Sequence, residues 1–152
     1  MVSSIMSMIN AWNITDFFLS LCEPEAGDTI SNLKMQKLLY YAQGFHLALY
    51  NESLFPEKIK AWQYGPVVEE IYNEYREYNS GAIPKPRRIN TKVFDEEKIS
   101  FLKEIYQVYG QYSALRLMQL THSESPWNTT KIGEEIPLEK MKTYFKSLIT
   151  NE

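Results

Sequence analysis

The chain has 152 residues, of which 44% are hydrophobic, and its 16 basic and 19 acidic side chains leave a formal net charge of -3. This length and composition suffice for one globular domain, and the charge excludes a global positive field that would attract nucleic acid or anionic membranes. Cys22 is the only cysteine, so an intramolecular disulfide is excluded. The start of the chain lacks a basic segment followed by an apolar run, and no stretch approaches the roughly 20 apolar residues that span a bilayer. We therefore expect a cytoplasmic protein.

The first third of the chain predicts two packed helices. Residues 11–21 place apolar side chains on one broad side of a helix. Ser31 or Asn32 can accept the free N–H groups that open a second helix, over residues 33–50. This helix is apolar around most of its circumference, which predicts a central, buried position. Gly44 in its middle costs about 1 kcal/mol relative to alanine, so we expect a neighbouring element to approach closely there.

A link and a third helix are expected next. Residues 57–64 are typical of a short extended or 3₁₀ link that carries Trp62 toward the core. Proline is favoured at the first position of a helix, so Pro66, after Gly65, predicts a third helix that runs to about residue 78. The acidic residues of this helix share its outward side at helical spacing: Glu70, Glu74 and Glu77.

A long surface loop is predicted over residues 79–94, which contain Gly81, Pro84 and Pro86. The loop carries the one concentrated basic patch of the chain, formed by Lys85, Arg87, Arg88 and Lys92.

The last third of the chain predicts further helical segments. A fourth helix begins after Asp95 and ends at Gly110, and a fifth begins after Ser113. A short turn opens at Ser125, before a proline, and a terminal helix opens at Pro137. The whole pattern predicts a mainly α fold, a compact single-domain bundle of six or seven helices with one long basic surface loop.

Two blocks of sequence resemble one family. The first covers residues 33–50 and continues through residues 61–67, and the second is Thr-His-Ser-Glu-Ser-Pro-Trp at residues 121–127. Both resemble the Panacea domain, also called the SocA-like antitoxin domain, which is found in phage-associated GepA-type proteins. The resemblance extends over residues 11–150, with residues 1–10 as an N-terminal extension. It implies a bacterial or prophage antitoxin that neutralises its toxin by direct protein–protein binding.

The same resemblance implies partners. The cognate toxin is expected from the adjacent gene, and in one branch of the family the antitoxin delivers its toxin to a protease. A proteolytic or regulatory adaptor without a cognate toxin is therefore an alternative. The chain has no obvious helix-turn-helix appendage or basic arm, so nucleic acid is not an expected partner.

A third interpretation is a small hydrolase that uses His122 and Glu124. The two residues stand beside two serines and supply a base, an acid and hydroxyls. Catalytic sets are assembled in space from distant parts of a chain, however, so adjacency in sequence is weak support. The structural interpretation is favoured: Ser125 before Pro126 is typical of a helix cap, and the helix dipole favours Glu124 nearby.

No cofactor or metal is expected. His46 lies on the apolar second helix and has no second ligand at metal-binding spacing, which favours a hydrogen-bonded core histidine. Cys22 follows an apolar helix and has no basic neighbour, which favours a small buried side chain. The chain has neither a P-loop nor a Gly-x-Gly-x-x-Gly motif.

Candidate partner-binding residues come from four segments. Trp62, Tyr64 and Pro66 stand on an irregular segment beside the central helix, where binding residues concentrate and aromatic rings supply binding energy. An ionic rim and a contribution from the second block are also expected. The complete candidate set is Trp62, Tyr64, Pro66, Glu70, Glu74, Arg87, Arg88, His122 and Glu124.

Overall fold

The computed structural model describes residues 9–150, and residues 1–8 of the expected N-terminal extension lie outside them. The elements follow in the order α2 (Ala11–Leu21), 3₁₀ helix η1 (Pro24–Ala26), α3 (Asn32–Tyr50), β1 (Lys60–Trp62), β2 (Gly65–Val67), α4 (Glu69–Glu74), η2 (Arg76–Tyr78), η3 (Thr91–Val93), α5 (Glu96–Tyr109), α6 (Ala114–His122), α7 (Ser125–Asn128) and α8 (Leu138–Thr150). Seven α-helices and one two-stranded sheet therefore make up the described chain. The predicted mainly α fold is confirmed.

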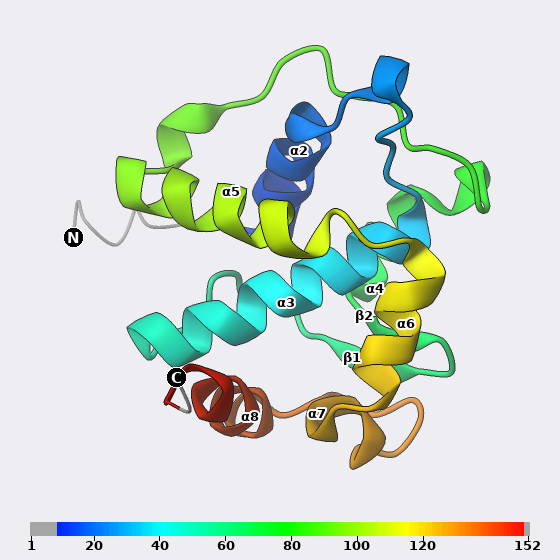
Figure 1. Cartoon of the computed structure of the whole chain (residues 1–152). Helices are drawn as coiled ribbons and strands as arrows, with labels where there is room; N and C mark the ends of the chain where they lie inside the picture. The colour runs from blue at the N-terminus through cyan, green and yellow to red at the C-terminus, as the bar shows by residue number, and fades with distance from the viewer. Residues whose placement is uncertain (1–8, 151–152) are drawn as a thin grey trace.

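Helix α3 is the central element, as predicted. Helices α2 and α5 lie above it in Figure 1, α8 and α7 lie below, and α6 crosses near the start of α3. Ser31 caps its first turn by accepting the backbone N–H of Lys34 at 3.2 Å. The expected close approach occurs at Gly44, where an added Cβ would stand 2.1 Å from the ring of Phe145 on α8. Helix α8 thus packs directly on the α3 backbone.

Residues 60–67 form an antiparallel β-hairpin, so the prediction of a helix starting at Pro66 is wrong. Lys60 pairs with Val67 and Ala61 with Pro66. Because proline lacks an N–H, it is tolerated on an edge strand. The free N–H of Val68 is taken by the Gln36 side chain at 2.8 Å, and α4 begins only after it.

The other edge of β1 is covered by the chain that precedes α8. The Ala61 N–H donates to the Glu134 carbonyl at 2.9 Å, and the Ile136 N–H donates to the Ile59 carbonyl at 2.8 Å. The hairpin is therefore held between α3 and residues 133–136, and its turn faces outward.

The predicted caps of α5 and α6 are confirmed. Asp95 accepts the N–H of Lys98 at the start of α5, and Ser113 accepts the N–H of Arg116 at the start of α6. Within residues 9–150, no helix is long and apolar enough to cross a membrane.

The basic loop is anchored at both ends. The Ile83 N–H donates to the Ile30 carbonyl at 2.9 Å, and Phe94 is buried edge-on against Phe17. Between these anchors Arg87 and Arg88 are exposed. The predicted surface loop is confirmed, with the short helix η3 as its only helical turn in the described chain.

Candidate functional site

The two sequence blocks meet at a pair of tryptophans. The Trp127 indole Nε1 donates to the backbone carbonyl of Trp62 at 2.8 Å. The Trp62 indole Nε1 donates in turn to a carboxylate oxygen of Glu69 at 3.1 Å, and its ring packs edge-on against Tyr72. Contacts between distant parts of the chain thus fix the position of the hairpin.

A groove of about 490 Å³ opens beside this hairpin. Two of its apolar side chains are strongly exposed: Tyr64 at 59% in the hairpin turn and Ile132 at 55%. Asn79 lines the opposite side with a backbone φ of 53°, a left-handed conformation that strains a residue other than glycine. The groove is lined by Asn32, Leu33, Trp62, Gln63, Tyr64, Val67, Tyr72, Asn79, Ser80, Ile132 and Gly133. It is an open, largely apolar surface with polar edges.

The inner side of the hairpin rests on a buried lysine. Lys37 of α3 is fully buried, and its Nζ donates to the Pro66 carbonyl at 3.1 Å. Burial lowers the pKa of Lys37 to about 7. Gly65 packs directly on this side chain, with φ at 113°. Pro66 is itself buried, so among the candidate partner-binding residues it supports the surface from below.

Glu124 also points inward, into the core. It is 8% exposed, and its two oxygens accept the hydroxyls of Tyr40 at 2.9 Å and Tyr41 at 2.8 Å. Burial raises the pKa of Glu124 to about 7, while the two hydrogen bonds act in the opposite direction. The residue stands at the cap position of α7, but its side chain makes no capping bond, and Ser125 is the first helical residue. The prediction that Ser125 caps this helix is therefore wrong.

His122 makes its ring contact with Trp127. Its ring stacks on Trp127 with centroids 4.0 Å apart and an angle of 17° between the planes. The Nε2 atom is enclosed and has no hydrogen-bond partner among the described residues. The Ser123 hydroxyl donates to the Leu120 carbonyl. The described side chains of this block therefore form no chain of proton transfer between a base, an acid and a hydroxyl.

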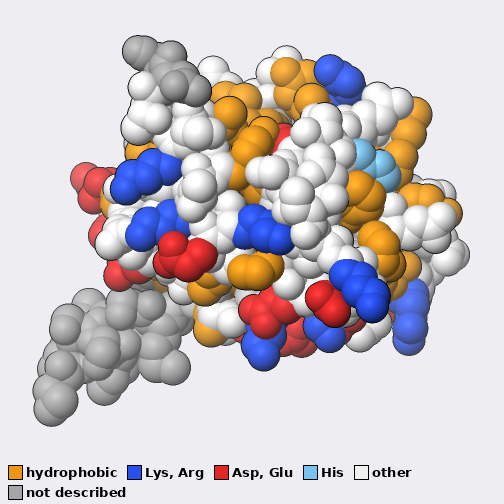
Figure 2. Space-filling view, turned by 90° about the horizontal axis from the view of Figure 1, so that it is seen from below, with side chains coloured by type: hydrophobic (Ala, Val, Ile, Leu, Met, Phe, Trp, Pro, Cys, Tyr) orange, Lys and Arg blue, Asp and Glu red, His pale blue; other side chains and the backbone are white. Residues whose placement is uncertain are grey.

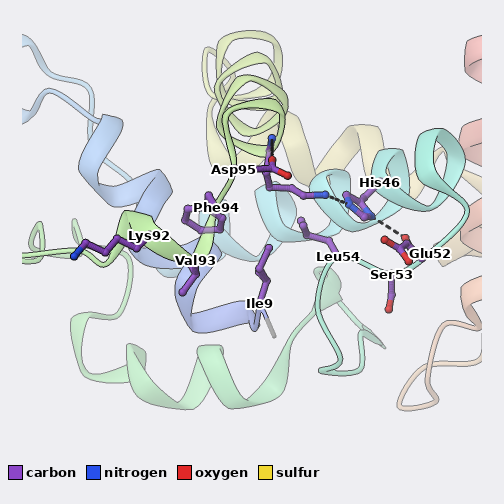
Figure 3. Close-up of a pocket in the computed structure, with 10 residues that line it drawn as sticks. Ile9, His46, Glu52, Ser53, Leu54, Lys92, Val93, Phe94 and Asp95 are labelled. Carbon is purple, nitrogen blue, oxygen red and sulfur yellow. Dashed lines mark hydrogen bonds between the residues drawn. The ribbon is translucent and has the colours of Figure 1, made fainter. Parts of the chain in front are cut away.

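His46 is hydrogen-bonded on both sides, as predicted for a core histidine. Its Nδ1 lies 2.7 Å from the Glu52 carbonyl, and its Nε2 contacts the Nζ of Lys98 (Figure 3). Burial lowers the pKa of His46. Cys22 is buried, and its thiol donates to the Leu19 carbonyl. Within residues 9–150 no three side chains of His, Cys, Asp or Glu are grouped closely enough to hold a metal ion.

The charged candidates lie on separate surfaces. Glu70 and Glu74 are exposed on the outward side of α4, as predicted, and Arg87 and Arg88 are exposed on the loop before η3. Seen from below, the molecule intermixes acidic and basic side chains with exposed hydrophobic ones (Figure 2). No single charged patch dominates that face.

Four residues of the candidate site were missed by sequence reasoning. Sequence reasoning assigned no role to Lys37 or to Ile132. It also assigned no role to Tyr40 and Tyr41, whose hydroxyls bind Glu124. The one available signal was the placement of Lys37 inside an otherwise apolar helix face.

Two comparisons relate this chain to known proteins. A curated relative, Antitoxin SocA of Caulobacter vibrioides (strain NA1000 / CB15N), is 29% identical over 115 residues, which cover 68% of this chain and 61% of the relative. The aligned part is thus less than two thirds of that protein's length. No solved structure matches the chain. The family described as "Antitoxin SocA-like, Panacea domain" matches residues 35–128, the span that holds the hairpin, most of α3 and both tryptophans, and the chain belongs to this family.

Proposed function

We propose that this chain is a non-enzymatic antitoxin that neutralises a toxin by direct protein–protein binding in the bacterial cytoplasm. The observation that carries the proposal is the family match over residues 35–128, within which the two blocks converge at the bond between Trp127 and Trp62. The toxin is expected from the adjacent gene.

The groove beside the hairpin is the proposed toxin contact. Tyr64 presents an exposed aromatic ring on a turn that is held by hydrogen bonds on both flanks, so little order must be gained when a partner binds. Exposed aromatic and aliphatic side chains around an apolar recess are typical of protein interfaces. Trp62 and Ile132 form the walls against which a partner side chain would pack.

The remaining candidates are assigned around this groove. We place Glu70 and Glu74 in an acidic rim, because they are exposed on the helix that also supplies Tyr72. Arg87 and Arg88 supply a separate basic contact, and His122 extends the surface on the side of Trp127. Pro66 and Glu124 support it from inside.

The inward position of Glu124 supports a non-enzymatic role over the hydrolase alternative. A general acid or base must reach the substrate, and both carboxylate oxygens of Glu124 are occupied by tyrosine hydroxyls in the core. His122, stacked on Trp127, has no described hydroxyl or carboxylate on its Nε2. The two side chains are thus placed for packing.

The test is a growth-rescue assay in a bacterial host. The adjacent reading frame is induced with and without this chain, and growth is followed together with co-purification of the two products. We expect growth arrest that is relieved by this protein, with both chains eluting as one complex. The proposal would be contradicted if induction of the adjacent reading frame did not arrest growth. Rescue of growth without association of the two proteins would also contradict it.

Two matched variants locate the contact in the same assay. Tyr64→Ala should weaken the complex and the rescue, whereas Leu115→Ala should leave both unchanged. Leu115 on α6 is also 59% exposed but lies outside the groove. Loss of the toxin protein only when a host protease is present would indicate the adaptor alternative, in which delivery replaces simple inhibition.

A further inference from the structure

We propose that a polar recess at the starts of α3 and α6 binds a small phosphate group, either free phosphate or a phosphate carried by a small molecule. The recess has a volume of about 490 Å³ and lies apart from the hairpin groove. Its charged and hydroxyl-bearing lining residues are Asp28, Thr29, Ser31, Lys34, Ser80, Tyr112 and Ser113.

The main attraction for an anion is the ammonium of Lys34. The residue is only 8% exposed, and its Nζ donates to the Gly110 carbonyl at 2.6 Å. An ammonium has three N–H donors, and the contacts within residues 9–150 give an acceptor to one of them. The two ion pairs of the described chain do not include Lys34, so no carboxylate lies within 4.0 Å of it there. A buried charge of this kind is stabilised by an anion that supplies both opposite charge and acceptors.

Several hydroxyl groups line the same recess as this ammonium. The Ser31 and Ser113 side-chain oxygens accept backbone N–H groups of Lys34 and Arg116, so each hydroxyl hydrogen stays available to donate. Ser80 and Thr29 add two further hydroxyls to the lining. A phosphate group, with several strong acceptor oxygens, matches a recess that offers donors from several directions. The starts of α3 and α6 also favour negative charge there.

Asp28 is the one acidic group in the lining, and it weakens the attraction. Both of its oxygens accept the Tyr106 hydroxyl, at 2.9 and 2.8 Å, and one also accepts the Glu23 N–H. The Tyr106 hydroxyl of α5 and the Glu23 N–H thus offset part of the negative charge of Asp28. Because one cation is opposed by one anion, we expect a dissociation constant of about 1 mM for inorganic phosphate.

The test is a titration of the isotopically labelled full chain with inorganic phosphate, followed by amide NMR at constant ionic strength. We expect saturable shifts of the Ser31, Lys34 and Ser113 amides, with no such response to sodium chloride. Lys34→Met should abolish saturation, while Lys92→Met, which alters an exposed lysine of the basic loop, should not. Ser80→Ala provides a second variant that leaves Lys34 and its bond to Gly110 in place, and it should weaken binding about threefold.

A parallel titration with glycerol phosphate distinguishes the two sources of the group. At least tenfold tighter binding than inorganic phosphate would identify a small phosphorylated molecule as the ligand, and equal affinity would identify free phosphate. Shifts that grow linearly without saturation, that also occur with chloride, or that persist in both Lys34→Met and Ser80→Ala would overturn the proposal.

Discussion

The hairpin turn has two sides with opposite properties. On the inner side, Gly65 and Pro66 are buried against α3, and the Pro66 carbonyl is bonded to the Lys37 amine. On the outer side, Tyr64 is the most exposed aromatic residue of the described chain and makes no side-chain hydrogen bond there. Neighbours in one motif therefore differ completely in their surroundings. Adjacent residues of one motif need not share a role, because the fold buries some of them and exposes others.

The second block repeats this division. Glu124 is bonded to Tyr40 and Tyr41 in the core, whereas His122 lies nearer the surface on the face of Trp127. Substitutions on the inner side should therefore act on the free energy of unfolding, and substitutions on the outer side should act on partner binding. Four substitutions test this division.

The largest loss of stability is expected from Gly65→Ala. An alanine Cβ at this position would stand 2.6 Å from Cε of Lys37 and 3.0 Å from Oγ1 of Thr121, at a φ of 113° that strains any L side chain. Backbone strain and overpacking together should lower the free energy of unfolding by about 4 kcal/mol, measured by urea denaturation.

Gly133→Ala is the matched control for that change. Gly133 also has a positive φ, of 94°, but nothing lies within 4 Å of an added Cβ. The Gly133→Ala variant should therefore lose only the free energy of unfolding that backbone strain costs, about 1–2 kcal/mol. Equal losses in the two variants would show that the contact with Lys37 is not tightly packed.

The next largest effect is a pH dependence that Glu124→Gln should remove. Burial raises the pKa of Glu124 from 4.5 to about 7 in the folded state. Between these values the folded chain holds a proton that the unfolded chain has lost, so the stability of the natural chain falls as pH rises from 4.5 to 7. The difference in unfolding free energy across this window should be on the order of 3 kcal/mol.

Denaturation of the natural chain and the variant at several pH values measures this effect. Glutamine carries no charge, so the Glu124→Gln variant should lack this component of the slope. Glu139→Gln, which changes an exposed carboxylate on α8, should keep the slope of the natural chain. The same slope in Glu124→Gln would mean that another group titrates in this range.

Local signals account for the parts of the fold that sequence predicted. Asp95 and Ser113 predict the starts of α5 and α6 because a capping side chain accepts a backbone N–H three residues further along the chain. This contact needs no tertiary structure. The hairpin was missed because its strands have only three residues each, and a proline occupies one of them. Its stability comes from Gln36 and from the Glu134 carbonyl, which are distant in sequence.

The candidate site was predictable only in outline. The exposure of Glu70 and Glu74 follows from helical spacing. A contribution of the second block to the same surface was expected from the sequence, but the hydrogen bond between Trp127 and Trp62 that joins the two blocks was not. The direction of Glu124 did not follow, because it depends on two tyrosine hydroxyls that lie more than eighty residues earlier in the chain. Partners at such separation leave no local pattern.

A smaller change in stability near neutral pH is expected from Lys37→Met. The variant removes the hydrogen-bond donor to the Pro66 carbonyl, which is destabilising, but it also removes the cost of burying an amine. Because these two effects partly cancel, the free energy of unfolding should change by at most about 2 kcal/mol at pH 7. The pH dependence carries the clearer signal. Since burial lowers the pKa of Lys37 from 10.5 to about 7, the unfolded chain binds the extra proton between these values.

The natural chain should therefore gain stability relative to Lys37→Met as pH rises from 7 toward 10. Denaturation series for the two proteins across this range measure the difference, and Lys103→Met supplies an exposed control on α5. A flat difference would show that the Lys37 amine keeps its proton in the folded state.

The smallest effect on folding is expected from Tyr64→Ala. The ring is 59% exposed and donates no hydrogen bond within the described chain, so its loss should change the free energy of unfolding by less than about 0.5 kcal/mol. If the groove binds the toxin, the same change should weaken the complex by more than about 2 kcal/mol, or roughly thirtyfold, as expected for a central aromatic contact. Chemical denaturation and calorimetric titration of the purified pair measure the two quantities on one protein. Equal losses of stability and binding in this variant would place Tyr64 with the buried, inner side of the turn. The division between the two sides would then fail between Tyr64 and Gly65, which are adjacent in sequence.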